Sequence, residues 1–278
     1  MEITKDSGPV GAVAEGEVWS MGVVKQEIEG RVATVTIDSP STLNTLSSAV
    51  VGELLEVVES LALRGDVGAV ILTGAGEKAF VAGADIKEMS VKSPMEARAF
   101  AELGQRLTTT LEKMPQPVVG VVNGLALGGG CEIALACDIR ICSENARFGQ
   151  LEINLGIMPG WGGTQRLSRL CGPGFAKELI FTGRMADAQE ALRWGLVNAV
   201  YPLDELMDRA REMATTIASK SGVIQAGAKL ALQRAFDQDL AGGLRLEADL
   251  FGLCFTTEDQ KEGMAAFLGK RAPQFGHR

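Results

Sequence analysis

The sequence predicts an α/β fold whose last quarter is helical. Short runs rich in β-branched residues recur through the first two thirds of the chain, and long amphipathic segments separate several of them. Strands that alternate with helices are typical of α/β proteins. After Pro202 the pattern changes to almost continuous helix. With 46% hydrophobic and 22% charged residues, the 278-residue chain can bury a sizeable core.

Four strands and two helices are predicted in the first two thirds of the chain. The strands are expected at Arg31–Ile37, Val67–Thr73, Pro117–Val122 and Ile139–Cys142. The helices are expected at Ser48–Leu63 and Ser93–Met114. The second helix begins with a serine suited to the N-cap, a proline at the first helical position, and Glu96 three residues after the cap.

The C-terminal region is expected to form helices that need covering. Leu244–Phe255 is apolar nearly all round, so it must be buried on more than one side. Thr257 to Gln260 is a second capping box, which opens a last helix that ends at Leu268. We therefore predict three parts: a flexible N-terminal tail at 1–22, a core of strands and helices at 23–202, and a helical region at 203–278.

Composition excludes several classes of protein. A net charge of −8 argues against a nucleic-acid surface. The longest uncharged apolar stretch, Pro115–Cys131, contains two prolines and five glycines and is a poor membrane span. The N-terminal residues resemble neither a signal peptide nor a transit peptide. The five cysteines form no CxxC pair, which indicates reduced thiols rather than a disulfide framework. We expect a cytoplasmic protein without a membrane partner.

The single histidine narrows the possible chemistry. His277 is the penultimate residue, where chains usually fray. A Ser-His-Asp or Cys-His arrangement is therefore not expected, and neither is a histidine-ligated zinc site. Any acid–base catalysis must therefore use carboxylates, lysines or the one tyrosine, Tyr201.

Glycine is concentrated between Gly120 and Gly163, which hold ten of the 34 glycines. The triplet Gly128–Gly130 can be a tight turn between a strand and a helix, or a helix start whose free N–H groups hold an anion. Its spacing fails the dinucleotide fingerprint, and Thr73–Phe80 fails the phosphate-binding loop pattern. The triplet alone does not decide between the two interpretations.

Two glutamates lie in this glycine-rich, apolar context. Glu132 follows the triplet, and Glu152 lies 20 residues later. Each can be structural, the first at a helix N-terminus and the second on a surface loop. As a pair they suit general acid–base catalysis, with one protonated and the other ionised. The small-residue turn at Ala82–Ala84 either leads to an N-cap at Asp85 or supplies a second backbone N–H donor.

Four segments together resemble the enoyl-CoA hydratase (crotonase) family. They are "AGADIKEM", "NGLALGGGCEIALACDI", "FGQLEINLGIMPGWGGTQRL" and "FTTEDQKEGMAAFLGKR", in the expected order from about Val24 to Phe275. The resemblance implies a crotonase-like superhelix of repeated ββα units with a helical C-terminal trimerisation region. It also implies a homotrimer or homohexamer that acts on acyl-CoA thioesters in fatty acid metabolism, as in β-oxidation. No separate cofactor or metal is implied, since coenzyme A is part of the substrate.

The family's site residues map onto this chain by position. The oxyanion hole falls on the backbone N–H groups of Ala84 and Gly129, and the two catalytic glutamates on Glu132 and Glu152. The contacts to coenzyme A fall on Ala84, Asp85, Ile86 and Lys87, with Phe267 and Lys270 of a neighbouring subunit at the adenosine end.

The implied reaction is the reversible syn addition of water to a trans-2-enoyl-CoA, which gives the 3-hydroxyacyl-CoA. Glu132 would act as base on the water, and Glu152 would supply the α-carbon proton. Leu151 replaces a proline common in the family, and Ser41–Leu46 also departs from its pattern, which leaves the acyl-chain preference open. Two alternatives remain: an enoyl-CoA isomerase with the same oxyanion hole, and a non-catalytic RNA-binding relative.

Overall fold

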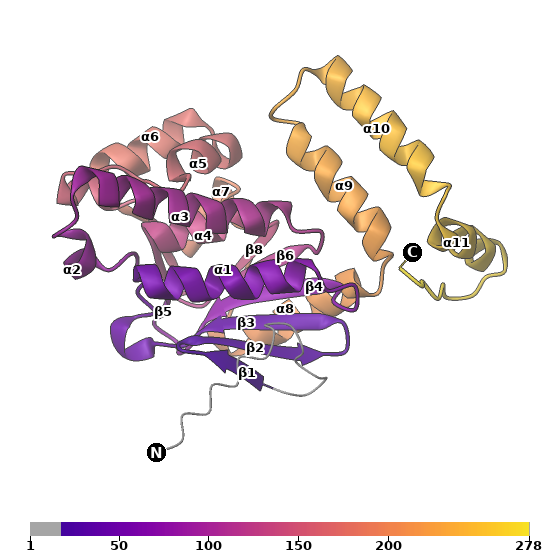
Figure 1. Ribbon diagram of the computed structural model, residues 1–278, viewed down its shortest axis with the longest axis horizontal. Helices are drawn as coiled ribbons and strands as arrows, with labels where there is room; N and C mark the ends of the chain where they lie inside the picture. Colours follow the sequence, from indigo (N-terminus) through magenta and orange to yellow (C-terminus); the bar gives the residue numbers. More distant parts are fainter. Residues whose placement is uncertain (1–17, 278) are drawn as a thin grey trace.

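The larger of two sheets forms the base of the molecule. The computed structural model of the chain describes residues 18–277 (Figure 1). Within them, the larger sheet has the strand order β1-β2-β3-β4-β6-β8-β11. Strands β1 to β3 are antiparallel, and the others continue parallel to β3. The bounds are β1 Val18–Met21, β2 Val24–Glu29, β3 Val32–Ile37, β4 Ala69–Gly74, β6 Val118–Val122, β8 Ile139–Ser143 and β11 Ala199–Tyr201.

A smaller sheet lies beside it, in the order β10-β9-β7-β5. Its strands are three residues long: β5 Ala79–Val81, β7 Leu125–Leu127, β9 Arg147–Gly149 and β10 Met185–Asp187. The chain passes from the larger to the smaller sheet three times, as β4–β5, β6–β7 and β8–β9. A helix follows each passage: α3 Pro94–Lys113, α4 Gly129–Ala136 and α5 Gly163–Cys171. This is the expected superhelix of ββα units.

Helices cover both faces of the larger sheet, so its central strands are buried throughout. Every residue of β4 and of β6 is buried. Val70 and Leu72 belong to the core that includes α1 (Ser48–Ala62), whereas Ala69 and Ile71 pack with α8 (Leu203–Ala218). Buried parallel strands therefore read as continuous apolar runs rather than as alternating patterns.

The remaining helices complete the body of the molecule. They are η1 Pro40–Thr42, α2 Ile86–Met89, η2 Glu152–Leu155, α6 Pro173–Thr182 and α7 Ala188–Arg193. The predicted capping box is present on α3: Ser93 Oγ accepts from Glu96 N, and the Glu96 carboxylate accepts from Ser93 N at 2.8 Å. The second capping box is half formed, since Thr257 Oγ1 accepts from Gln260 N, but Gln260 Nε2 donates to Met264 Sδ.

Two features of the strands differ from the sequence-based expectations. Strand β1 lies at Val18–Met21, in a segment expected to be an unstructured tail, because its backbone pairs with β2. Residues 1–17 lie outside the described part of the chain. The short strands of the smaller sheet were not predicted individually, because three residues are too few to show a period of two.

The C-terminal helices extend away from the sheets (Figure 1). They are α9 Gly222–Arg234, α10 Leu240–Cys254 and α11 Glu258–Leu268. Helix α10 was expected to be buried on more than one side, but it has no buried residue in the single chain. Phe251 and Leu253 are 65% and 59% exposed. Across residues 18–277, no helix has the length and apolar character needed to cross a membrane.

Candidate active site

The glycine triplet allows three segments to approach one another closely. Gly128 has φ +51°, a conformation that favours glycine, and a Cβ there would lie 3.1 Å from Glu152 Oε1. A Cβ on Gly130 would lie 2.1 Å from the carbonyl oxygen of Val81, so helix α4 packs directly on β5. The backbone of Gly128 also donates to Gly149 O at 2.8 Å. The triplet is therefore both a tight turn and a point of close approach.

Two backbone N–H groups at this place have no acceptor. Gly129 N lies in the first turn of α4, where helical amides have no intrahelical partner. Ala84 N lies in a turn in which Leu46 N donates to Gly83 O and Asp85 N donates to Leu46 O. Among the described residues, nothing accepts a hydrogen bond from Ala84 N or Gly129 N.

The turn at Ala84 adjoins the start of α4. Gly83 has φ +118°, and a Cβ there would lie 3.3 Å from the carbonyl oxygen of Leu127, the residue before the triplet. Two unpaired donors from neighbouring segments can bind an oxyanion, and such donors stabilise negative charge that develops during a reaction.

Glu132 is almost fully buried beside these donors. It is 2% exposed, and its Oε1 accepts from Trp161 N and Gly163 N, both at 2.7 Å. Burial raises the pKa of the Glu132 carboxyl to about 7, and the nearby charge of Glu152 acts in the same direction. The two backbone hydrogen bonds oppose that rise. A carboxyl that titrates near neutrality can serve as a general acid or base.

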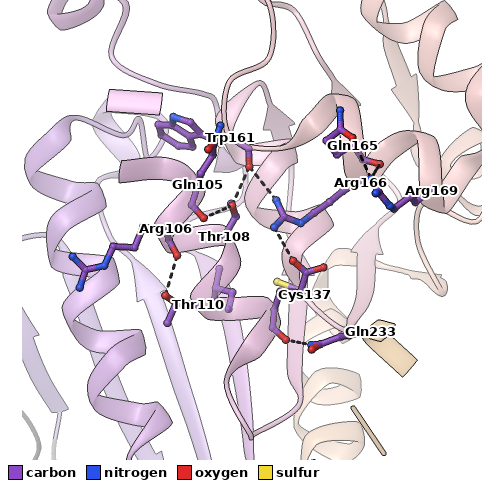
Figure 2. Close-up of polar contacts among 12 residues, drawn as sticks. Gln105, Arg106, Thr108, Thr110, Cys137, Trp161, Gln165, Arg166, Arg169 and Gln233 are labelled. Atoms are coloured by element: carbon purple, nitrogen blue, oxygen red, sulfur yellow. Dashed lines mark hydrogen bonds and ion pairs between the residues drawn. The ribbon is translucent and has the colours of Figure 1, made fainter. Parts of the chain in front are cut away.

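The loop that holds Glu132 is itself fixed by two helices. Figure 2 shows Thr108 of α3 and Arg166 of α5 directed at the backbone carbonyl of Trp161. Thr108 Oγ1 donates to that oxygen at 2.9 Å and Arg166 Nη1 at 3.0 Å. The Trp161 ring packs edge-on against Phe100, with 5.2 Å between ring centroids. The donors to Glu132 are therefore set in place before any substrate binds.

Glu152 begins helix η2, three residues after the last residue of strand β9. Its side chain is partly buried, and this burial raises the pKa of its carboxyl. The structure therefore brings the two predicted glutamates together at the glycine triplet, from two different ββα units. Burial raises the pKa of both carboxyls, which favours proton transfer by such groups near neutral pH.

The predicted coenzyme A contacts are only partly assembled in one chain. Asp85 is the N-cap of α2, since its Oδ1 accepts from Glu88 N at 3.0 Å, so this residue has a structural role next to Ala84. Ile86 and Lys87 are exposed beside it. Phe267 and Lys270 are exposed as well, but α11 lies at the opposite end of the molecule from α2 (Figure 1).

Two residues near the site had no sequence signal. Glu88 accepts from Ser48 N at 2.9 Å and from Lys92 Nζ at 2.7 Å, which joins α2 to α1 and lowers the pKa of Glu88 to about 2. Gln150 is fully buried beside Glu152. The described residues hold no cluster of three potential metal ligands.

The comparisons with known proteins agree with this geometry. Residues 27–278 match the sequence profile of the family described as enoyl-CoA hydratase/isomerase. The chain is 53% identical to a short-chain-enoyl-CoA hydratase of Clostridium acetobutylicum, over 88% of this chain and 94% of that protein. It is 47% identical to a crotonyl-CoA hydratase of Syntrophomonas wolfei, over 90% of this chain and 96% of that protein.

Solved structures agree as well. The fold matches that of an enoyl-CoA hydratase from Bacillus anthracis with a TM-score of 0.89 and 40% identity, over 92% of this chain and all of that one. The ββα superhelix, the unpaired amides and the profile match lead to one assignment: the chain belongs to the enoyl-CoA hydratase/isomerase (crotonase) family.

Proposed function

We propose that this protein is a short-chain enoyl-CoA hydratase. It adds water reversibly, in the syn sense, to a trans-2-enoyl-CoA and forms the 3-hydroxyacyl-CoA. The observation that carries the proposal is the placement of Glu132 and Glu152 beside two backbone N–H groups that lack acceptors. The names of two relatives, a short-chain-enoyl-CoA hydratase and a crotonyl-CoA hydratase, support the choice of substrate.

The oxyanion hole receives the charge that the addition creates. When water adds to the β-carbon, electron density moves onto the thioester oxygen. Ala84 N–H and Gly129 N–H donate to that oxygen, and the N-terminus of α4 lies behind it. One such donor typically accelerates a reaction by ~10²–10³. The thioester is the electron sink, so the addition itself requires no redox step.

The two glutamates divide the proton transfers. Glu132 is the base that takes a proton from the attacking water, and Glu152 delivers a proton to the α-carbon. The raised pKa values suit both tasks, because Glu132 titrates at about 7 and Glu152 retains its proton to higher pH than an exposed carboxyl does. In the reverse reaction each group performs the opposite step.

The division of the chain follows from this site. Segment 23–202 is the catalytic core, and Ala84 to Lys87 contacts the coenzyme A part of the substrate. Region 203–278 is an assembly region through which chains associate as a homotrimer or homohexamer. A neighbouring chain's Phe267 and Lys270 then reach the adenosine end, because in one chain α11 lies far from α2.

The alternative functions lack a supporting observation of this kind. An isomerase moves a proton between two carbons and can work with one carboxylate, whereas this site has two. An RNA-binding role fits poorly with a net charge of −8.

Substrate assays test the proposal directly. We expect the purified protein to hydrate crotonyl-CoA, followed by the loss of the conjugated enoyl absorbance, and to be less efficient with long-chain enoyl-CoA. A 3-enoyl-CoA in parallel reports isomerase activity. Rapid isomerisation of the 3-enoyl-CoA without hydration of crotonyl-CoA would favour the alternative enzyme instead.

A further inference from the structure

Arg166 of helix α5 is a largely buried arginine that the acid–base scheme leaves without a role. Its side chain is 14% exposed, and its Nη2 donates to Oε2 of Glu112 on α3 at 2.8 Å. Its Nε is buried and has no acceptor among the described residues. A buried N–H without an acceptor costs free energy, so the remaining contacts of this guanidinium should indicate what it does.

The guanidinium packs against the turn that holds Glu132. Its Nη1 donates to Trp161 O at 3.0 Å (Figure 2). Along the chain, this carbonyl lies between the N–H groups of Trp161 and Gly163, which both donate to Oε1 of Glu132. Gly162 has φ +109°, and a Cβ there would lie 2.2 Å from Arg166 Nη1. The backbone N–H of Arg166 also donates to Gly162 O at 2.9 Å, so Arg166 holds the turn through both its backbone and its side chain.

The charge of Arg166 acts on Glu132 as well. Burial raises the pKa of Glu132 and the charge of Glu152 acts in the same direction, whereas the charge of Arg166 lowers that pKa. Glu112 offsets part of the Arg166 charge, but the Glu112 side chain is 41% exposed and therefore better screened by water. Arg166 is thus the cation that opposes the two influences favouring protonated Glu132.

We propose that Arg166 is a positioning residue for Glu132: it fixes the turn whose two N–H groups hold the carboxylate, and its charge favours the ionised base. The inference rests on the hydratase function proposed above. Glu132 can take a proton from water only as a carboxylate, and a buried carboxylate needs compensation for the water that it has lost. The arginine supplies part of this compensation through the backbone of residues 161–163.

The effect of Arg166 on the pH dependence has a definite sign. The pKa of Glu132 is about 7 with the arginine in place. Loss of the positive charge should raise this pKa further, by up to about one pH unit. Hydration needs ionised Glu132, so the ascending limb of its pH profile should move to higher pH. A variant without the charge should therefore fall furthest behind wild type at low pH and recover as the pH rises.

The test compares Arg166→Met with Arg169→Met. Arg169 is an exposed arginine of the same helix, and its Nη1 donates to Gln165 O and Gln165 Oε1, both at 3.3 Å. Both variants remove one positive charge from α5, but only Arg166 reaches Trp161 O (Figure 2). We expect Arg166→Met to lose kcat/KM for crotonyl-CoA hydration on the order of 10- to 100-fold at pH 6, and several-fold less at pH 8.5. Arg169→Met should follow wild type at both pH values.

Arg166→Lys separates the charge from the hydrogen bonds to the turn. Lysine keeps the cation but lacks the planar fork that joins Trp161 O to Glu112. We therefore expect this variant to lose kcat/KM by a similar factor at every pH, with its ascending limb close to that of wild type. A loss in Arg166→Met that is equally large at every pH would overturn the inference, because it would indicate a structural role alone.

An infrared titration reads the pKa of Glu132 without an activity assay. The signal is the band of the protonated carboxyl, and Glu132→Gln is the blank. We expect a higher pKa in Arg166→Met than in wild type and Arg169→Met, and Arg166→Gln gives the same comparison if the methionine variant folds poorly. Equal pKa values would overturn the inference. Absence of crotonyl-CoA hydration in wild type, with the pKa difference present, would instead overturn the proposed function.

Discussion

At the scale of single residues, the buried carboxyl of Glu132 makes stability depend on pH. Its pKa is raised from 4.5 to about 7, so the folded chain binds this proton more tightly than the unfolded chain does. The stability that protonated Glu132 contributes to the folded state is fully present below pH ~4.5. It is lost as the pH rises through about 7. A change of this size corresponds to at most ~3 kcal/mol.

Glu132→Gln should remove this pH dependence. We expect the unfolding free energy of the variant to increase relative to that of wild type as the pH rises from 5 to 8, because the amide cannot ionise. Denaturant titrations at the two pH values measure the difference. A variant that loses stability in parallel with wild type over this range would show that Glu132 does not carry the effect.

Gly104 in helix α3 gives a second residue-scale prediction. A Cβ at Gly104 would lie 2.2 Å from the ring of Trp161, whereas a Cβ at Gly52 in α1 would meet nothing within 4 Å. Gly104→Ala should therefore lose ~1–3 kcal/mol of unfolding free energy. It should also lose activity, because the displaced ring belongs to the residue whose N–H holds Glu132. Gly52→Ala is the matched control and should gain ~0.5–1 kcal/mol; equal stability of the two variants would contradict the packing.

Some of these residues were predictable and others were not. Glu132 stood out because a carboxylate in an apolar, glycine-rich segment needs an explanation, and Glu152 lies in a similar segment 20 residues later. The donors to Glu132 come from residues 29 and 31 positions away, a contact that only the folded loop creates. Gln150 was missed because a single polar residue after a short strand has no spacing or periodicity that would mark it as buried.

At the scale of elements, long segments were easier to predict than short ones. Helices α1 and α3 begin and end within about two residues of their predicted bounds. Each repeats the helical hydrophobic pattern over several turns and has a serine at its N-cap. The second sheet escaped detection because its strands are held by neighbours rather than by their own pattern. Strand β1 was missed for the same reason, as its pairing with β2 determines it.

Lys229 is the buried residue of helix α9, and it links that helix to the core. Lys229 Nζ donates to Leu111 O at 3.3 Å and Gln116 O at 3.0 Å, and it lies 2.7 Å from Asp138 Oδ2. Burial raises the pKa of Asp138, and the lysine charge opposes that rise. Removal of the lysine would leave a largely buried carboxylate without its cation.

Lys229→Met should therefore destabilise the protein by ~1–3 kcal/mol. The double variant Lys229→Met/Asp138→Asn is the control, because it also removes the Asp138 carboxylate that the single variant leaves without a cation. Denaturant unfolding should show part of the loss recovered in the double variant. A single variant as stable as wild type would mean that the lysine does not anchor α9.

At the scale of the whole molecule, the C-terminal helices expose more apolar surface than a stable monomer usually does. Large side chains on α10 and α11 are largely exposed, among them Leu244, Phe251, Leu253, Phe267 and Leu268. Patches of this kind mark interaction surfaces. The sequence predicted an apolar helix that must be buried, and in the single chain that helix has no buried residue.

We expect light scattering to find a multiple of three chains per particle at micromolar concentration. Phe251→Glu should weaken the assembly and lower activity with it, since each chain would lose its neighbour's Phe267 and Lys270. Glu247→Gln, on the same helix, changes a polar residue and should leave the assembly intact. A stable monomer with full activity would contradict this assembly.

The central claim of the account is that two carboxyls share the chemistry at one oxyanion hole. Glu132→Gln and Glu152→Gln keep the side-chain shape, and the oxyanion donors belong to the backbone, so both variants should fold and bind coenzyme A thioesters as wild type does. The decisive measurement is kcat for crotonyl-CoA hydration in each variant, beside a far-UV spectrum and a binding titration. We predict a loss of at least ~10²-fold in both. Near wild-type turnover in one variant would contradict the paired mechanism, and full activity in both would contradict the site.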